Sequence, residues 1–546
     1  MQNWSIVPHQ ISQKFRDPGR AVPGIFVVLY AFFVFSPAAG ILGTFLSAIS
    51  GGNFGVLAQM MPTGRTLSLL LTSTLYATAV AGTGMALGIM VATFLSRMQR
   101  RFMLGSIVFL VACTPIPPYI HALAWNNALA AVNALLAGAG SPPLVLAGWI
   151  IAWWVQVMAL LPFACLLCII AINSVSRELL EVAQLHNADR SVFARVLVPL
   201  SMPVLGAGFG FLFLLSIVDY SVPSLFSADT YALDIFAGFS ATGSPAAAFA
   251  ASIPLLMVTT LVLIQSQSGI RALGEHPGSF GGGEFPLKEW PTWFLAFQGG
   301  AVLILCLQVL VLLSGVGVGS GSLAAITGTI GSSGPEIFFS LMVALLSAVV
   351  TIPLAFGVAT ILPKEGLLRP VSWLLVTLPL AIPAPLTGIG MIAFWGPWIS
   401  RPVFSGALLP VCAAVARFAP IAVIIISAQI HMVDRTLMEA ATIFSRSRVS
   451  SLIHVMVPLV APGIVIATAF VFSLTLGELG ATLLVAPPGY ATLTMKIYNY
   501  LHYGSFSGVT GLCAVLAGIT VTGVLAGLGC IWLWKKTYAH GGGIHD

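Results

Sequence analysis

The sequence predicts an all-α polytopic membrane protein with about twelve transmembrane helices. Of the 546 residues, 58% are hydrophobic and only 7% are charged, whereas a soluble domain carries about 25% charged residues. The apolar residues gather in long continuous runs, and a bilayer core needs roughly 20 apolar residues of helix. Membrane β-strands are about ten residues long and alternate, so these runs favour helices.

Twelve apolar runs are long enough to cross a bilayer as helices. They cover approximately residues 24–48, 68–95, 103–123, 145–171, 203–219, 245–265, 291–314, 337–361, 371–395, 406–428, 463–480 and 508–534. The polar stretch before the first run contains no short apolar core with a cleavage site, so we expect no removable signal peptide.

The positions of Lys and Arg predict that both termini are cytoplasmic. With the N-terminus inside, 18 of the 22 basic residues fall on the cytoplasmic side, as the positive-inside rule requires. Arg65, Arg401 and Lys496 fall outside, and Arg417 falls within a span. Membrane topology thus accounts for the net charge of +6, and we expect no nucleic-acid partner.

The chain contains an internal duplication. The segment EVAQLHNADRSVFARVLVPLSMP (181–203) matches EAATIFSRSRVSSLIHVMVPLVAP (439–462), because both begin E-x-A and end V-P-L-x-x-P. Further along, Asp219 matches Glu478, 259 positions later. We therefore expect two tandem six-helix halves in a parallel repeat, related by a pseudo-two-fold axis along the membrane normal.

Glycine-rich stretches mark the expected boundary between the halves. Gly274–Glu284 has the composition of a flexible linker. It predicts a first permease half at 1–280 and a second at 281–546. The stretch 315–335 is also rich in Gly and Ser, and we interpret it as an outer loop.

The repeated segment resembles the EAA loop of binding-protein-dependent ABC importer permeases. Asn187 and Ser445 stand where the family usually has Gly. Asn tolerates a left-handed backbone, so Asn187 is the milder change. The matching residues are Glu181, Ala183, Asn187, Pro199 and Pro203 in the first copy and Glu439, Ala440, Ala441, Ser445, Pro458 and Pro462 in the second.

The composition of this segment suits a docking element. A leading acidic residue favours a helix N-terminus, and small residues allow another protein to approach closely. In the second copy, Ile443, Phe444, Val449 and Ile453 form a candidate apolar face. The alternative is an amphipathic segment lying on lipid headgroups. Its occurrence twice at matching positions on the predicted cytoplasmic side favours docking.

The resemblance implies a type I ABC importer permease fold and a bacterial inner-membrane location. It also implies two cytoplasmic ATP-binding cassette subunits and an extracytoplasmic solute-binding protein. The sequence contains no Gly-Lys dipeptide, so it has no P-loop of the form G-x-x-x-x-G-K-[ST]. We expect no enzymatic activity and no cofactor on this chain, with ATP and Mg bound by the partner subunits.

Two further segments resemble fused ferric-iron importer permeases. They are VDYSVPSLF (218–226) and GELGATLLVAPPGYATLTMKIYNYLHYG (477–504). The resemblance extends over about residues 65–530 and implies Fe(III) import by alternating access. Permeases for 2-aminoethylphosphonate, thiamine, polyamines, sulfate and molybdate share much of this pattern. A twelve-helix secondary transporter is another alternative, which the repeated segment and the scarcity of ionisable groups in the spans disfavour.

Two acidic residues are candidates for the substrate pathway, because charged groups near membrane depth are costly. Asp219 and Glu478 lie near the outer ends of matching spans. One hypothesis is that they admit or gate a cationic or metal-bearing solute. The alternative is that each carboxylate caps a re-entrant turn, a reading that Ser221 and Thr482 favour. For Arg417, we favour pairing inside the bundle over contact with substrate.

Proline-rich segments are expected to interrupt two helices. Pro117 lies in Pro115–Pro118, and Pro383 in Pro383–Pro385. Carbonyls freed at such breaks can line a cavity, and a packing kink is the alternative. The scattered histidines have no metal-site spacing, so we predict no metal site. We interpret Cys165 and Cys168 as buried apolar residues.

Overall fold

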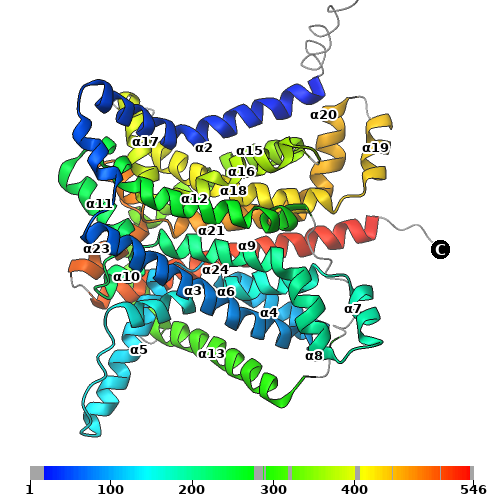
Figure 1. Ribbon diagram of the computed structural model, residues 1–546, viewed down its shortest axis with the longest axis horizontal. Coiled ribbons are helices and arrows are strands. Elements are labelled where there is room, and N and C mark those ends of the chain that lie inside the picture. The colour runs from blue at the N-terminus through cyan, green and yellow to red at the C-terminus, as the bar shows by residue number, and fades with distance from the viewer. Residues whose placement is uncertain are drawn as a thin grey trace, which may run out of the picture.

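The computed structural model describes residues 18–275, 287, 290–317, 323–363, 365–399, 406–444, 447–503 and 506–541. All regular secondary structure in these ranges is helical. Most of the long helices run along the longest axis of the molecule, and short helices gather at its two ends (Figure 1). The structure thus confirms the all-α fold class.

Eleven helices within the described ranges are long and apolar enough to cross a membrane, and one bent helix pair raises the number to twelve. The number of spans agrees with the sequence prediction. The eleven long helices are built on α2 (Pro18–Ser50), α3 (Arg65–Ser96), α5 (Pro118–Gly138), α6 (Trp149–Asn173), α9 (Val198–Ile217), α12 (Pro245–Glu275), α13 (Thr292–Gly317), α15 (Gly334–Ile361), α18 (Leu408–His431), α21 (Val457–Leu476) and α24 (Phe506–Gly541).

The two proline-rich segments interrupt helices as predicted. Helix α4 (Arg100–Cys113) ends before them and α5 starts at Pro118, so the expected continuous span 103–123 is wrong. In the later segment, α16 (Leu368–Thr377) and the 3₁₀ turn η3 (Leu378–Ala381) precede α17 (Ala384–Ile399), with a bend of 98°. Proline lacks an N–H and clashes with the preceding turn, and hydropathy does not register either effect.

Short helices connect the spans at the end opposite α7 (Arg177–Gln184) and α19 (Arg435–Phe444). The loop expected at 315–335 is wrong over its described part, since α13 reaches Gly317 and residues 323–332 form a helix, α14. The short elements at this end are η1 (Phe54–Met60), α10 (Ser221–Leu225), α11 (Tyr231–Thr242), α14 (Leu323–Ser332), α22 (Thr482–Val485) and α23 (Leu493–Tyr503).

The first helix of each expected half packs against the other half. Helix α2 packs on α15, α17 and α18, and α13 packs on α3, α5 and α6. Figure 1 shows α2 and α13 on opposite sides of the molecule. Glycines permit the approach of α2 to α17: a Cβ on Gly40 would lie 2.4 Å from the carbonyl oxygen of Gly390. The first helix of each expected half therefore contributes to the packing between the two halves.

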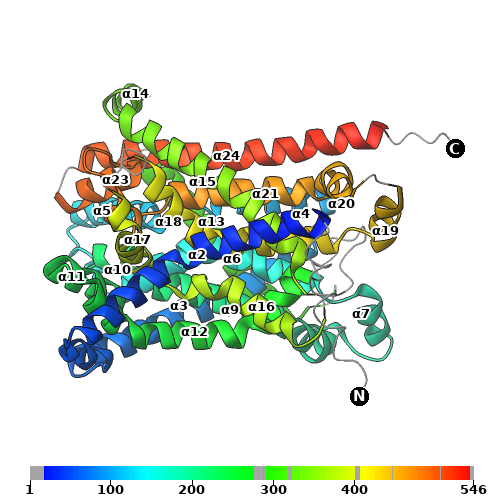
Figure 2. The ribbon, with the colours of Figure 1, turned by 90° about the horizontal axis from the view of Figure 1, so that it is seen from above.

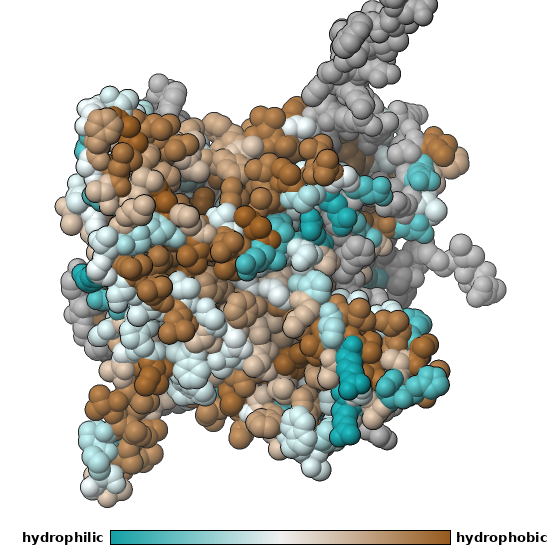
Figure 3. Space-filling view, viewed as in Figure 1, coloured by the Kyte–Doolittle hydropathy of each residue, from teal (hydrophilic) through white to brown (hydrophobic). Residues whose placement is uncertain are grey.

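The surface is apolar over most of the visible face, and polar residues concentrate toward the end that carries α7 and α19 (Figure 3). Leu75 and Leu303 are about 70% exposed on long helices. Such exposed side chains are suited to contact with lipid, because lipid tails are as apolar as the side chains themselves. The interior consists of two main hydrophobic clusters, one around α3, α6 and α9 and one around α2, α15, α18 and α21.

Candidate functional site

The first copy of the repeated segment is helical. Helix α7 (Arg177–Gln184) is followed by a short turn, α8 (Asp189–Val192) and the π-helical turn η2 (Phe193–Leu197), which leads into α9. Glu181 lies in the middle of α7, so the expectation that it begins a helix is wrong. The helix starts four residues earlier, and Glu178 supplies the acidic residue of the first turn.

Asn187 closes the C-terminal end of α7. Its side-chain Nδ2 donates a hydrogen bond to the carbonyl oxygen of Ala183 at 3.2 Å. Among the described residues other than glycine, only Ser227 has a positive φ. Asn187 therefore does not use the left-handed backbone that its place in the pattern suggested, and it satisfies a helix-terminal carbonyl instead.

The second copy has the same order of elements: α19 (Arg435–Phe444), α20 (Arg448–Ser451) and the π-helical turn η5 (Leu452–Met456), which leads into α21. Glu439, Ala440 and Ala441 lie in α19, and Ser445 lies outside the described residues. Before α19, Oδ1 of Asp434 accepts hydrogen bonds from the amide and hydroxyl of Thr436, both at 2.9 Å. These bonds lower the pKa of Asp434.

The two copies lie at one end of the molecule. Figures 1 and 2 show α7 and α19 at this end and on different sides of it, with the start of α2 and the end of α24. Glu181 and Glu439 are exposed. So are large apolar side chains: Leu185 is 75% exposed, Ile443 76% and Phe444 87%. Ile453 is also exposed, and Val449 is half-buried. Below, α7 and α19, together with the exposed apolar side chains in and next to them, are called the coupling surfaces.

The π-helical turns are a matched feature that sequence analysis missed. They begin at Phe193 and Leu452, 259 positions apart, and each is followed by a proline, Pro199 or Pro458. Proline cannot donate to the carbonyl four residues earlier, so the regular i→i−4 ladder is broken at this point. The V-P pair in both copies was the available signal. Pro203 and Pro462 lie inside the following helices.

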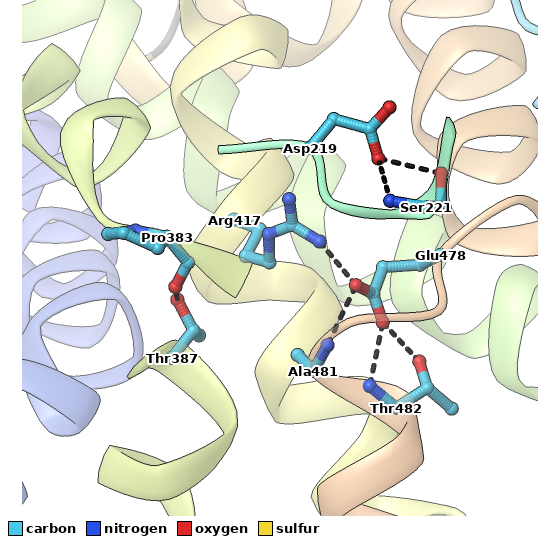
Figure 4. Close-up of polar contacts among 8 residues, drawn as sticks. All are labelled: Asp219, Ser221, Pro383, Thr387, Arg417, Glu478, Ala481 and Thr482. Atoms are coloured by element: carbon cyan, nitrogen blue, oxygen red, sulfur yellow. Dashed lines mark hydrogen bonds and ion pairs between the residues drawn. The ribbon is translucent and has the colours of Figure 1, made fainter. Parts of the chain in front are cut away.

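The two acidic residues of the candidate pathway both cap short helices (Figure 4). Oδ1 of Asp219 accepts hydrogen bonds from the amide of Ser221 at 2.9 Å and from its hydroxyl at 2.7 Å. Glu478 accepts from the amides of Ala481 at 2.9 Å and Thr482 at 2.8 Å, and from the Thr482 hydroxyl. The capping geometry predicted for these acids is confirmed.

The two acids differ in their charged partners. The Arg417 guanidinium, on α18, forms an ion pair with Glu478, which confirms that Arg417 pairs inside the bundle. The side chains of Arg417 and Glu478 are 21% and 3% exposed. No ion pair of Asp219 occurs within the described part of the chain, and its buried Oδ2 lacks a hydrogen-bond partner.

The proline breaks lie beside the segments that carry these acids. A Cβ on Gly477 would lie 2.7 Å from Cγ of Pro117. The carbonyl of Pro117 accepts from the amide of Ile120 at 3.0 Å, and that of Pro383 from the amide of Thr387 at 3.0 Å. These two carbonyls are therefore used by the helices that follow them.

Two surface hollows lie elsewhere. One of about 440 Å³ lies between α2 and α17, and one of about 350 Å³ lies between α3 and α6. Neither is lined by a residue predicted for the pathway. Within the described ranges there is no group of three or more His, Cys, Asp or Glu side chains placed to hold a metal ion.

Comparison with known proteins identifies relatives of one kind. No family model matches the chain. A molybdenum ABC transporter permease protein of Haloferax volcanii is 30% identical over 198 residues, which are 34% of this chain and 71% of the relative. The 2-aminoethylphosphonate transport system permease protein PhnV of Salmonella paratyphi A is 41% identical over 68 residues, 12% of this chain.

These alignments differ in extent. The match spans only about a quarter of PhnV, 26% of its length. The putrescine transport system permease protein PotI of Escherichia coli is 24% identical over 156 residues, which are 28% of this chain and 56% of PotI. The molybdenum permease is matched over more than two thirds of its length. Together with its many apolar helices, this match shows that the chain is a multi-pass membrane protein that belongs to the ABC transporter permease family.

Proposed function

We propose that this chain is the permease subunit of an ATP-driven, binding-protein-dependent importer for a small solute. The observation that carries the proposal is the matched pair of coupling surfaces, which expose apolar side chains at one end of a membrane protein of the permease family. On this proposal, that end is cytoplasmic, both termini lie in the cytoplasm, and the membrane is the bacterial inner membrane.

Each coupling surface is connected to one acid of the candidate pathway by a single helix. Helix α9 runs from η2 to Ile217, just before Asp219, and α21 runs from η5 to Leu476, just before Glu478. Twenty residues of helix are about 30 Å long. When a docked ATPase displaces α7 or α19, helix α9 or α21 moves with it as a rigid body. The motion thereby reaches the opposite side of the membrane, as alternating access requires.

The partners follow from this arrangement. Two ATP-binding cassette subunits dock on the two coupling surfaces and bind ATP and Mg, and a solute-binding protein delivers the solute at the opposite face. This chain itself binds no cofactor and performs no covalent chemistry. The duplicated order of elements supports a division into halves at 1–280 and 281–546.

Ferric iron is the leading substrate candidate, because segments 218–226 and 477–504 resemble ferric-iron importer permeases. A second candidate is 2-aminoethylphosphonate, supported by the 41% identity with PhnV. Molybdate and polyamines follow from the names of the other relatives. A gradient-driven secondary transporter would not need the coupling surfaces.

Uptake of radiolabelled ferric iron tests the proposal, in cells with the partner proteins and with or without this chain. The test variant carries Glu181→Ala and Glu439→Ala, and the control is Glu365→Ala, an exposed acid in another segment. Uptake that needs the chain, falls about tenfold in the double variant and is unchanged in the control supports the proposal.

Other outcomes separate the alternatives. Iron uptake that is indifferent to the chain removes iron, and labelled 2-aminoethylphosphonate is then tested in the same cells. Uptake that stops when the proton gradient is collapsed, with ATP maintained, indicates a secondary transporter. A chain that purifies without any ATPase and transports without ATP contradicts the importer proposal itself.

A further inference from the structure

The two matched acids differ in their local electrostatics. Glu478 is neutralised by Arg417, and its two carboxylate oxygens accept four hydrogen bonds in all. Before the repeated segment the halves are offset by 258 positions, as Glu181 and Glu439 show, so the residue that matches Arg417 is Ala159, which carries no charge. The duplication therefore retains the acid in both halves and the compensating cation in only one.

Buried polar atoms without a regular hydrogen bond occur on Asp219, on Gln156 beside it and on Tyr220, the next residue. Oδ2 of Asp219 is buried and makes no hydrogen bond. The Gln156 side chain, on α6, is 1% exposed and lies beside this carboxylate, outside the geometry of a regular hydrogen bond. The hydroxyl of Tyr220 is buried and unpaired as well, and its ring stacks on Phe236 at 5.6 Å.

This cluster lies where the two halves meet. A Cβ on Gly480 would lie 3.6 Å from Cε1 of Tyr220 and 2.6 Å from Cβ of Ala384. Tyr220 is close enough to Asp219, Glu478 and Arg417 to interact electrostatically with all three. In Figure 4 the Asp219 carboxylate points toward Ser221, and the side chains of Arg417 and Glu478 point toward each other.

Buried polar atoms are normally satisfied, and a buried carboxylate without a cation is costly. Here a carboxylate oxygen and the amide that lies beside it are buried without a regular hydrogen bond, and the hydroxyl of the next residue, Tyr220, is buried without a partner. Such an arrangement is stabilised by a ligand that brings a positive charge and hydrogen-bond donors. The cluster lies at the interface between the two halves, which move relative to each other in alternating access. We therefore expect its ligand to be the transported solute.

We propose that Asp219, Gln156 and Tyr220 form a transit site for the positively charged group of the solute. The Arg417–Glu478 pair carries no net charge and has a structural role. This inference rests on the proposed importer function. A single carboxylate with an amide does not complete the coordination of a bare metal ion, and the described residues offer no larger cluster. The site therefore takes an ammonium group or a chelated metal cation, and it disfavours an oxyanion such as molybdate.

The test is uptake by proteoliposomes containing the full chain with its ATPase subunits and binding protein. The probes are a ferric chelate of net positive charge, 2-aminoethylphosphonate, putrescine and molybdate. Asp219→Asn removes the charge but keeps an oxygen that accepts from the Ser221 amide, so the cap is retained. The matched control is Asp229→Asn, which removes the same charge from an exposed ion pair with Arg65.

The expected result is uptake of a probe that carries a cationic group. Asp219→Asn lowers this uptake by about tenfold or more, the order expected for the loss of a charge-assisted contact. Gln156→Leu lowers it in the same direction, and Asp229→Asn leaves it unchanged. ATPase co-purification stays at the wild-type level in every variant, which separates a binding defect from misassembly.

Two results would overturn the inference and leave the importer function standing. One is ATP-dependent uptake of a cationic probe that is unchanged in Asp219→Asn. The other is uptake of molybdate alone. If no probe enters with ATP and no ATPase binds the chain, the proposed function fails and the transit site fails with it.

Discussion

Arg417 on α18 and Glu478, two residues after the end of α21, form an ion pair in the interior, although 61 positions separate them in the sequence. The same carboxylate caps α22 through the amides of Ala481 and Thr482. The pair therefore joins a mid-span cation to a re-entrant turn, and it holds α18, α21 and α22 in one arrangement.

Breaking this pair from one side is expected to destabilise the protein. Arg417→Met leaves the Glu478 carboxylate buried without a cation, at a cost of roughly 3–5 kcal/mol. Thermal unfolding of the purified chain in detergent measures the loss as a lower Tm. Adding Glu478→Gln removes the unpaired charge and is expected to restore part of the Tm.

The control for this prediction is Arg65→Met. Arg65 and its partner Asp229 are 71% and 64% exposed, and exposed pairs contribute about 0–1 kcal/mol. If Arg417→Met and Arg65→Met lower the Tm equally, the Arg417–Glu478 pair does not have the structural role assigned to it.

Packing of α2 on α17 is expected to depend on glycine. A Cβ on Gly390 would lie 2.2 Å from the carbonyl oxygen of Pro37, so Gly390→Ala forces the two helices apart. Overpacking of this kind costs about 1–3 kcal/mol. We expect a lower Tm and faster proteolysis of the chain near the start of α2.

Gly396 on the same helix provides the matched control. Nothing lies within 4 Å of a Cβ placed there, so Gly396→Ala is expected to be neutral or slightly stabilising. Equal effects of the two substitutions would mean that helix propensity, rather than the approach of α2, determines the outcome.

The apolar part of the coupling surfaces is expected to bind the ATPase. Phe444→Ser removes an aromatic side chain that is 87% exposed at the end of α19. Loss of an interface anchor of about 2 kcal/mol weakens binding roughly 30-fold. A titration of purified ATPase subunits against the chain in nanodiscs measures the affinity.

Leu367→Ser is the control, because Leu367 is 91% exposed in a different segment. We expect ATPase affinity to be unchanged in this variant. Weaker binding in both variants would indicate a general effect of surface apolarity rather than a defined docking surface.

The π-helical turns are expected to transmit motion rather than to bind partners. Pro199→Ala with Pro458→Ala restores two N–H donors and favours a regular α-helix through η2 and η5. We expect solute uptake to fall several-fold, about the effect of a partly uncoupled hinge, while ATPase affinity is retained. Uptake and ATPase binding are measured in the same proteoliposomes.

Pro254→Ala, inside α12, controls for the removal of a helix proline away from these turns. Uptake is expected to stay at the wild-type level in this control. A double variant that loses ATPase binding together with uptake would place Pro199 and Pro458 in the docking surface instead.

Local features of the candidate site followed from local sequence. The capping roles of Asp219 and Glu478 were predictable because an acid two to four residues before a Ser or Thr amide satisfies a nearby helix start. The breaks at Pro117 and Pro383 were predictable because proline acts on its own turn. The position of Glu181 inside α7 was predicted wrongly, since helix starts extend beyond the motif that identifies them.

The sequence by itself determined that the chain is a helical membrane protein with about twelve spans, duplicated segments and proline-broken helices. Hydropathy, repeats and the steric effect of proline each depend only on residues close together in the sequence. Only the tertiary structure decided that Glu478 has an arginine partner while Asp219 faces Gln156, and that α2 packs on α17. Those outcomes depend on which faces of distant helices meet. Helix faces in a membrane are matched by close packing and hydrogen bonds between helices, which no single segment encodes.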